Sequence, residues 1–480
     1  MEPSSLYETC LKRVAVLLKN GIWRSRRENP FRFMPSTVVD DLVSAMLLLH
    51  GPFGFRAADL ELLLTSGRLR ELKMNAMNVQ QELGTALKSL SSACQELKVL
   101  HLLRVVSEDP GLSEAIEELL RNSPRLEDVF CCIPFDLTAL RKCRELRKMK
   151  LSFPPQQRWC DFLERENSSF KPLKYLEVFS IFSTFLPSPC DDMVIILKHC
   201  PALTSLGLIE SSEALAHLHR TGVSPSELKL RRCLWGIRNK NVINSTLIRD
   251  AVLQCPKIEE LHFLVNSVES VRYLRDLRNL TFLDIMRNIS DKGELGALVI
   301  SVMETIGRQL KHLSLRFHSR MDISVLLEHC PNLESLQIHG GEFVKFSKAF
   351  VSLSNLKRLT LKDNNIGDEK LVLPLLSNCN QITDLFVKDC TAFDDETLKK
   401  FLQRNSLTNL KIAYLKNCSL TQHGFKKFLL SASHLEKVEI ISRSLHTRGV
   451  KQVLRETNHK VVCNKQPELW MDEFFMKKFK

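Results

Sequence analysis

The chain has 480 residues, more than one ordinary compact core accommodates, so several domains or an elongated array of repeats is expected. Hydrophobic residues make up 44% and charged residues 26%, a balance that excludes wholesale disorder. The formal net charge of +13 favours an acidic partner. Because no nucleic-acid-binding motif accompanies this charge, a protein partner is favoured over DNA or RNA.

The first predicted element is a helix over residues 6–20. Ser5 and Glu8 have the S-x-x-E spacing of a capping box, in which each side chain bonds to the backbone of the other residue. Gly21 is suited to the left-handed conformation that ends many helices. The apolar residues of this helix share one stripe. That stripe contains Leu6, Cys10, Val14 and Leu17.

A basic loop then leads to a second predicted helix within residues 34–51, with Thr37 as a candidate cap and Gly51 as the stop. Residues 57–64 predict a third helix that leads into a long repetitive region. We therefore assign residues 1–57 to a helical adaptor segment and 58–455 to the repeats. Residues 456–480 are assigned to a C-terminal cap or tail, in which Trp470 and Phe474 would cover the core of the last repeat.

The repetitive region contains about 15 copies of a hexad L-x-x-L-x-L, or a close variant, spaced about 26 residues apart. The alternating leucines predict a short strand with one buried face, and the rest of each copy predicts a helix. No copy can bury its apolar face alone, so neighbours have to stack. The predicted hexad starts are Leu69, Leu97, Leu126, Leu146, Leu173, Leu203, Pro225, Ile258, Leu280, Leu310, Leu333, Leu356, Ile382, Leu410 and Leu435.

These copies resemble the cysteine-containing and ribonuclease-inhibitor-like leucine-rich repeats. The Cys-Pro pairs that open copies at Cys200, Cys255 and Cys330 carry the resemblance, as does the stretch LTLKDNNIGDE at 359–369. The resemblance implies an α/β solenoid, or horseshoe, of about 15 units with strands on its concave face and helices on its convex face.

The opening segment resembles a VHL box. Ser5-Leu6, Cys10 and Val14 stand at the spacing of the BC box, the helix that binds elongin C. Met34-Pro35-x-x-Val38-x-x-x-Leu42 is similar to a cullin-2 box, and Thr37 stands where a cullin-5 box has proline. The resemblance implies elongin C contacts by Leu6, Cys10 and Val14. It also implies cullin contacts by Met34, Pro35, Val38 and Leu42.

This arrangement resembles a substrate receptor of the elongin B/C–cullin-2 ubiquitin ligases, with a protein target on the repeats. Three alternatives stay open. The first helix could be only a cap for the repeats. Residues 33–50 could begin an F-box that binds a Skp1-like adaptor, although no Trp-containing helix follows. The chain could also be a leucine-rich-repeat scaffold or inhibitor without a ligase.

The sequence offers no catalytic constellation, so we expect no enzyme, no cofactor and no metal site. The 15 cysteines include no C-x-x-C pair and are expected to be reduced, buried thiols of an intracellular protein. No secretory signal and no membrane-length apolar run is apparent, so a cytoplasmic or nuclear location without membrane contact is expected.

Basic residues recur at the sixth position after five successive hexad starts. They are Arg316, His339, Lys362, Lys388 and Lys416. Phe386 and Tyr414 stand two residues before the last two lysines. We interpret this column as a basic, partly aromatic stripe that holds an acidic or phosphorylated segment of the target. Scattered solvated charges are the alternative interpretation.

Overall fold

A computed structural model gives the fold of the chain. It describes residues 5–50, 56–75, 80–103, 110–152, 159–163, 173–181, 190–236, 245–287, 294–317, 321–340, 353–362, 369–441 and 447–457. The chain divides into two compact units, Met1–Leu208 with Ser226–Leu230 and Ile209–Pro225 with Arg231–Lys480. The predicted tail beyond Thr457, with Trp470 and Phe474, lies outside the described residues.

The first unit contains six of the described strands. They are β1 (Glu71–Asn75), β2 (Val99–Leu103), β3 (Asp128–Cys131), β4 (Lys148–Leu151), β5 (Val178–Ile181) and β6 (Ser205–Gly207). Its α-helices are α1 (Leu6–Lys19), α2 (Ser36–His50), α3 (Ala57–Leu64), α4 (Gln80–Ser91), α5 (Pro110–Arg121), α6 (Trp159–Leu163) and α7 (Cys190–His199). Two 3-10 helices, η1 (Pro30–Phe33) and η3 (Leu137–Lys142), also belong to it.

The second unit continues the same alternation of strand and helix. Its strands are β7 (Arg232–Trp235), β8 (Glu260–Leu264), β9 (Phe282–Met286), β10 (His312–Arg316), β11 (Ser335–His339), β12 (Arg358–Lys362), β13 (Asp384–Lys388), β14 (Ile412–Lys416) and β15 (Lys437–Ile441). Its helices are α8 (Ser211–Arg220), α9 (Ser245–Gln254), η5 (Val268–Asp276), α10 (Glu294–Ile306), η6 (Gly307–Gln309), α11 (Ile323–Glu328), α12 (Glu369–Ser377), α13 (Asp395–Leu402), α14 (Gln422–Ser431) and α15 (Thr447–Glu456).

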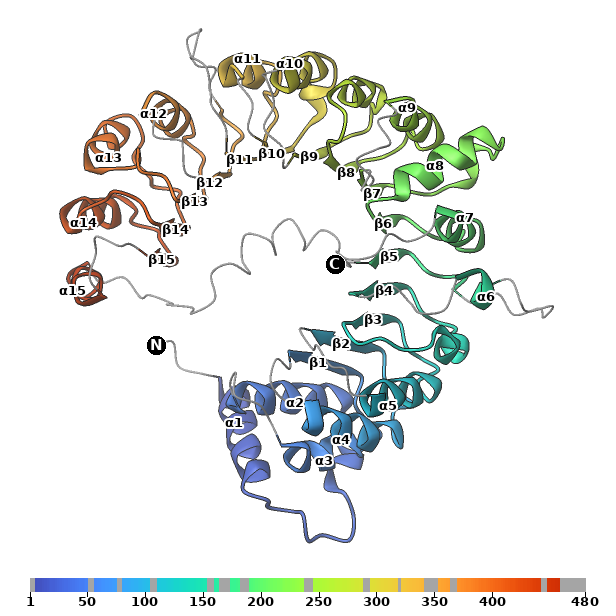
Figure 1. Cartoon of the computed structure of the whole chain (residues 1–480). Helices are drawn as coiled ribbons and strands as arrows, with labels where there is room; N and C mark the ends of the chain where they lie inside the picture. Colours follow the sequence, from blue (N-terminus) through green and yellow to red (C-terminus); the bar gives the residue numbers. More distant parts are fainter. Residues whose placement is uncertain are drawn as a thin grey trace. The chain divides into compact units, whose positions relative to one another are not determined.

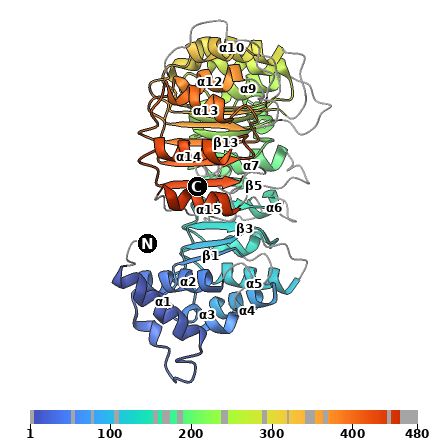
Figure 2. The ribbon, with the colours of Figure 1, turned by 90° about the vertical axis from the view of Figure 1, so that its left-hand side faces the viewer.

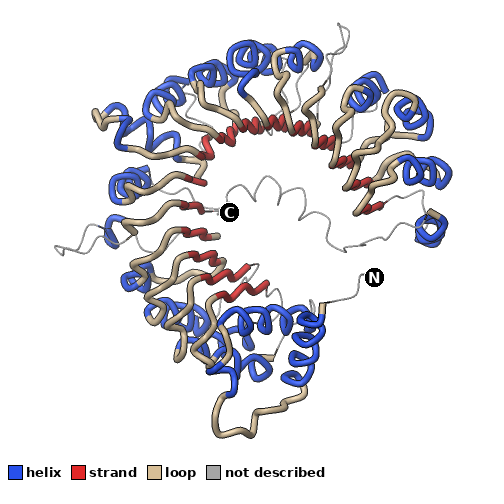
Figure 3. Tube along the Cα trace, turned by 180° about the vertical axis from the view of Figure 1, so that it is seen from behind, coloured by secondary structure: helices blue, strands red, loops and turns tan. Residues whose placement is uncertain are grey.

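Within each unit, every strand pairs in parallel with the next strand along the chain. The helices cover one face of the strands, and we call the opposite face the strand face (Figure 1, Figure 3). In β12, for example, Leu359 and Leu361 are buried toward the helices, and Arg358, Thr360 and Lys362 alternate with them on the strand face. With 15 strands in the described residues, the chain is an α/β leucine-rich-repeat solenoid of about 15 units.

Two of the predicted hexad starts are out of register. Every other predicted start lies two residues before a strand, but Leu173 and Pro225 do not. Leu176 and Leu230, which are both buried, occupy the equivalent positions before β5 and β7. Leu173 instead has a φ of 61° and lies in a turn. Pro225 begins the exposed 3-10 helix η4 (Pro225–Glu227), as suits a residue whose φ is fixed and whose backbone has no N–H.

The cysteines that precede the strands belong to the core. Burial raises the pKa of the Cys200, Cys255 and Cys330 thiols to about 12, so these groups are neutral and poorly nucleophilic. In the described part of the chain, no three His, Cys, Asp or Glu side chains gather to hold a metal ion. Nor does any described helix have the length and apolar character needed to cross a membrane.

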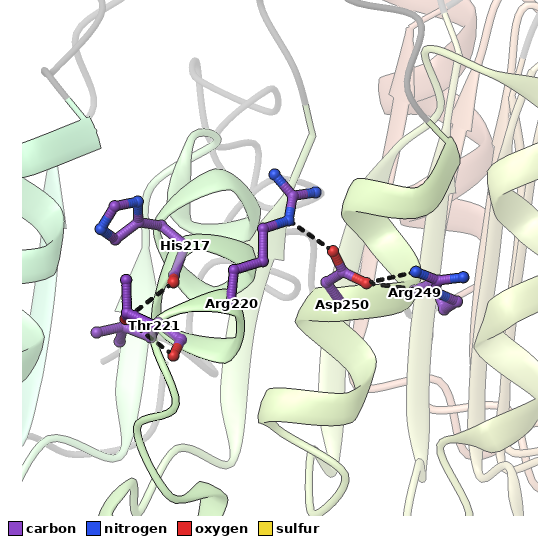
Figure 4. A network of polar contacts seen from close by, with 6 residues as sticks. His217, Arg220, Thr221, Arg249 and Asp250 are labelled. Atoms are coloured by element: carbon purple, nitrogen blue, oxygen red, sulfur yellow. Dashed lines mark hydrogen bonds and ion pairs between the residues drawn. The ribbon is translucent and has the colours of Figure 1, made fainter.

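A polar network joins two neighbouring helices of the second unit (Figure 4). Asp250 of α9 accepts a hydrogen bond from Arg220 of α8 at 2.8 Å and one from Arg249 at 3.1 Å. Although burial opposes ionisation of Asp250, the bonds from both arginines lower its pKa. The network therefore links the last residue of α8 to the middle of α9.

Candidate partner-binding surfaces

Helix α1 begins with the capping box that the sequence predicts. The Glu8 amide donates to Oγ of Ser5 at 3.2 Å, and the Ser5 amide donates to Oε2 of Glu8 at 3.3 Å. The helix is capped at its other end by Asn20, and Gly21 follows with a φ of 76°. Both ends of the helix are therefore fixed by local sequence.

Most of α1 lies outside the core of the first unit. Ala15 and Leu18 are its buried residues, and both are in the second half of the helix. Leu6 is 81% exposed, Cys10 is also exposed, and Val14 is half-buried. The predicted stripe is therefore divided: Leu6 and Cys10 are accessible to a partner, whereas Val14 and Leu17 are half-buried beside the packed Ala15 and Leu18.

The second predicted contact segment is also divided between surface and core. Met34 and Pro35 are exposed and Val38 is half-buried. Leu42 is only 2% exposed, so its assignment to a cullin contact has to be corrected. Because α2 packs against α1, α3 and β1, its inner face is enclosed. Leu42 lies on that face and belongs to the core.

Exposed apolar side chains are concentrated in this opening segment. In the described part of the chain, eleven large hydrophobic residues are exposed, and eight of them lie on α1, on α2 or between these helices. The eight are Leu6, Tyr7, Val16, Ile22, Phe33, Met34, Leu48 and Leu49. Figure 2 shows α1, α2 and α3 grouped beside β1. A concentration of this kind is typical of a protein-interaction surface.

Polar contacts hold this segment in place. Tyr7 donates its hydroxyl hydrogen to Oδ2 of Asp41 at 2.7 Å, which links the start of α1 to α2. Asn29 donates to the Leu62 carbonyl at 2.6 Å, and Arg24 forms an ion pair with Asp59. The sequence did not predict these contacts, of which the first attaches α1 itself and the other two attach the segment between α1 and α2 to α3.

The predicted basic column forms a continuous row on the strand face of the second unit. Arg316 pairs in register with His339, His339 with Lys362, Lys362 with Lys388, and Lys388 with Lys416. All five side chains are half-buried. We call these five residues the basic row. Parallel pairing without a register shift brings together residues that lie up to 100 positions apart in the sequence.

Two aromatic residues run beside the basic row. Phe386 and Tyr414 are also paired in register, and their ring centroids are 6.3 Å apart. They stand two residues before Lys388 and Lys416 on β13 and β14. Phe386 is half-buried, whereas Tyr414 is only 5% exposed, so the aromatic border presents mainly the Phe386 ring. The sequence spacing therefore predicted the relation between the aromatic and basic residues.

A buried ionic cluster at one end of the row was not predicted. Asp284 is fully buried, lies 2.8 Å from Nδ1 of His262, and accepts a hydrogen bond from Nε of Arg316 at 2.9 Å. Burial opposes its charge, but the bonds from His262 and Arg316 lower the pKa of Asp284 below its ordinary value. Because Asp284 is ionised beside it, Arg316 contributes less net positive charge than its position in the row suggests. His262 and Asp284 each stand four residues after a hexad start, and that shared position was the available signal.

Comparison with known proteins identifies no family. No protein-family model and no curated protein sequence matches the chain. Among solved structures, the yeast Rad7–Elc1 complex contains a chain that is 15% identical to this one, with a TM-score of 0.45. The match covers 97% of this chain and 99% of the yeast chain. The TLR13–ssRNA13 complex gives 19% identity and a TM-score of 0.45, covering 78% of this chain and 50% of that chain. A leucine-rich-repeat protein of Leptospira interrogans is 13% identical with a TM-score of 0.36. The match covers 84% of this chain and 91% of the Leptospira chain. This chain thus spans about half the length of the TLR13 chain, and the likenesses concern fold alone.

Proposed function

We propose that the protein is the non-catalytic substrate-recognition subunit of a cullin-RING ubiquitin ligase. Helix α1 docks elongin C, which arrives with elongin B, through Leu6, Cys10 and the half-buried Val14. The segment that follows docks cullin-2, and the strand face of the repeats binds the target protein. Such a subunit acts in the cytoplasm or the nucleus.

The observation that carries the proposal is the 81% exposure of Leu6 on a helix with a fixed start. A helix that only caps a repeat array is expected to present a polar outer face. Burying one exposed leucine in a partner's pocket is worth about 1.5–3 kcal/mol, enough to make Leu6 an anchor of an interface. The small Cys10 side chain, one turn later on the same stripe, lets a partner approach the helix closely.

The cullin contact is best supported by residues just before α2 and in its first turn, of which Met34 and Pro35 are exposed and Val38 is half-buried. We retain Met34, Pro35 and Val38 as the cullin contacts that the resemblance implies, and we remove Leu42 from that set. Phe33, which is 82% exposed, lies beside them and adds an apolar side chain that the motif does not include. We therefore assign the second contact to residues 33–38.

The proposal is tested with the full-length chain expressed together with elongins B and C. Wild type should retain both elongins through purification. Leu6→Ala together with Cys10→Phe should abolish this, because the anchor is lost and a bulky ring blocks close approach. Leu430→Asp is the matched control, because Leu430 is 62% exposed on α14, far along the chain from the contact, and should not affect retention.

Three results would overturn the proposal. If wild type retains no elongin, α1 is a cap and the chain is a binding scaffold without this ligase. If the double variant still retains the elongins although its helical content and melting temperature match wild type, the contact lies elsewhere. Retention of a Skp1-like adaptor through residues 33–50 would indicate an F-box protein instead.

A further inference from the structure

The basic row has a spacing that is set by the backbone. Neighbouring parallel strands lie about 4.8 Å apart, so the four intervals from Arg316 to Lys416 cover about 19 Å. A partner that meets every side chain of the row has to repeat its own acidic groups at nearly this interval. The row therefore selects the secondary structure of its partner as well as its charge.

Helical and extended partners differ in how well they match this interval. One face of an α-helix repeats every turn, so four turns cover about 22 Å. Residues on one side of an extended strand repeat about every 6.6 Å, so four intervals cover about 26 Å. Over the whole row, the helical repeat therefore differs from the strand spacing by about 3 Å and the extended repeat by about 7 Å. The helical spacing is the better match.

The charge around the row favours an acidic partner. The strand face from β9 to β15 carries six lysine and arginine side chains and three carboxylates. The cations are Arg316, Arg358, Lys362, Lys388, Lys416 and Lys437, and the carboxylates are Asp284, Asp384 and Glu439. Asp284 is bonded to Arg316, and Asp384 lies 3.3 Å from Arg358. Six cations against three carboxylates leave this face with an excess of positive charge.

The aromatic border gives the partner a second, apolar contact. Phe386 is half-buried beside Lys388, and Tyr414 lies against it. Gln337 of β11 aligns through Thr360 with Phe386 in the strand pairing. Its Oε1 atom is buried and makes no hydrogen bond within the described residues. A helix with one acidic stripe and an adjacent apolar stripe would cover the basic row and the rings together.

We propose that the basic row binds an acidic amphipathic α-helix of the target protein. The helix lies across β10–β14 with carboxylates at i, i+3 or i+4, and i+7 against the row, and with apolar side chains on Phe386, which the buried Tyr414 supports from the next strand. The inference rests on the proposed function only in taking the strand face as the target-binding surface. The elongin test involves α1, so either proposal can fail without the other.

The test measures fluorescence anisotropy of the full-length chain with two labelled peptides of identical composition. One peptide places glutamates at helical spacing with leucines on the adjacent stripe, and the other places the glutamates at alternate positions. The helix-spaced peptide should bind at least tenfold more tightly. Lys362→Glu together with Lys388→Glu should weaken its binding at least tenfold. Lys399→Glu, an exposed change on α13, should leave it unchanged.

Several outcomes would overturn the proposal. Equal affinity for both peptides would show attraction by charge alone. Tighter binding of a single-stranded RNA or of a phosphoserine peptide would assign the row to that partner. Undiminished binding by the double variant would place the site elsewhere. If charge reversal lowers the melting temperature, Lys362→Ala with Lys388→Ala replaces it, and the weakening of at least tenfold is still required.

Discussion

Helices α1 and α8 differ in how much of their surface the protein covers. Helix α1 has 14 residues, of which two are buried, whereas α8 has 10 residues, of which six are buried. Helix α8 packs against α9 and against the strand that follows it, β7, whereas the main neighbours of α1 are α2 and α3. The number of neighbouring elements, more than composition, decides whether an apolar stripe becomes core or remains surface.

The two helices also differ in what occupies their outer surface. Helix α8 ends in Arg220, which bonds to Asp250 of the next helix (Figure 4). Helix α1 begins with exposed Leu6 and Tyr7. If α1 is a docking element and α8 is a structural one, substitutions in the two helices should affect different measurements. The predictions below separate them.

The largest expected effect on stability is in α8. Leu215→Ala should lower the free energy of unfolding by about 3 kcal/mol, because a fully buried leucine leaves a cavity. Leu6→Ala should change it by less than about 0.5 kcal/mol, because the side chain is already in water. Urea unfolding of both variants gives the comparison. Similar losses for the two variants would mean that α1 is part of the folded core.

A smaller effect is expected from the polar network. Asp250→Asn should lower the free energy of unfolding by about 1 kcal/mol at neutral pH. The value is modest because solvent screens the two half-exposed arginines that bond to Asp250. Because the pKa of Asp250 is lowered by folding, its stabilisation is fully present above the ordinary value of about 4 and is lost as the pH falls below that.

Thermal unfolding at several pH values tests this sign. The difference in melting temperature between wild type and Asp250→Asn should be constant from pH 7 down to about pH 5 and should shrink toward pH 3. A difference that grows in acid would contradict the assignment of Asp250 as an ionised bridge between α8 and α9.

The most local effect is expected at the start of α1. Ser5→Ala removes one half of the capping box and should destabilise the first turn by about 1 kcal/mol. Faster hydrogen exchange at the Glu8 amide, which donates to Ser5, would report it. Ser431→Ala, at the exposed end of α14, is the control and should leave that amide unaffected. Unchanged exchange in Ser5→Ala would show that the cap does not hold the turn.

Most of the fold could be predicted from sequence because it repeats. The L-x-L pattern located strands such as Arg358–Lys362 correctly, since buried leucines alternate with strand-face residues. The same pattern failed at Leu173 and Pro225, where an apolar residue or a loose variant stood a few positions before the true start. Apolar character alone does not distinguish a turn leucine from a strand leucine, whereas backbone conformation does.

The candidate sites were predictable in part. Regular repeat spacing brought the basic row together, and the capping box fixed the start of α1. The burial of Leu42 was not predictable, because the motif does not say which face of α2 meets α3 and β1. The cluster of His262, Asp284 and Arg316 was missed because its members come from three repeats and depend on pairing across strands.

Hydrogen exchange of the full-length chain, with and without purified elongins B and C, tests the central claim most directly. The account predicts slower exchange over residues 6–14 when the elongins are added, because the exposed stripe of α1 becomes buried, and no change over α8 and α9. Binding without protection of residues 6–14, or no binding at all, would contradict it.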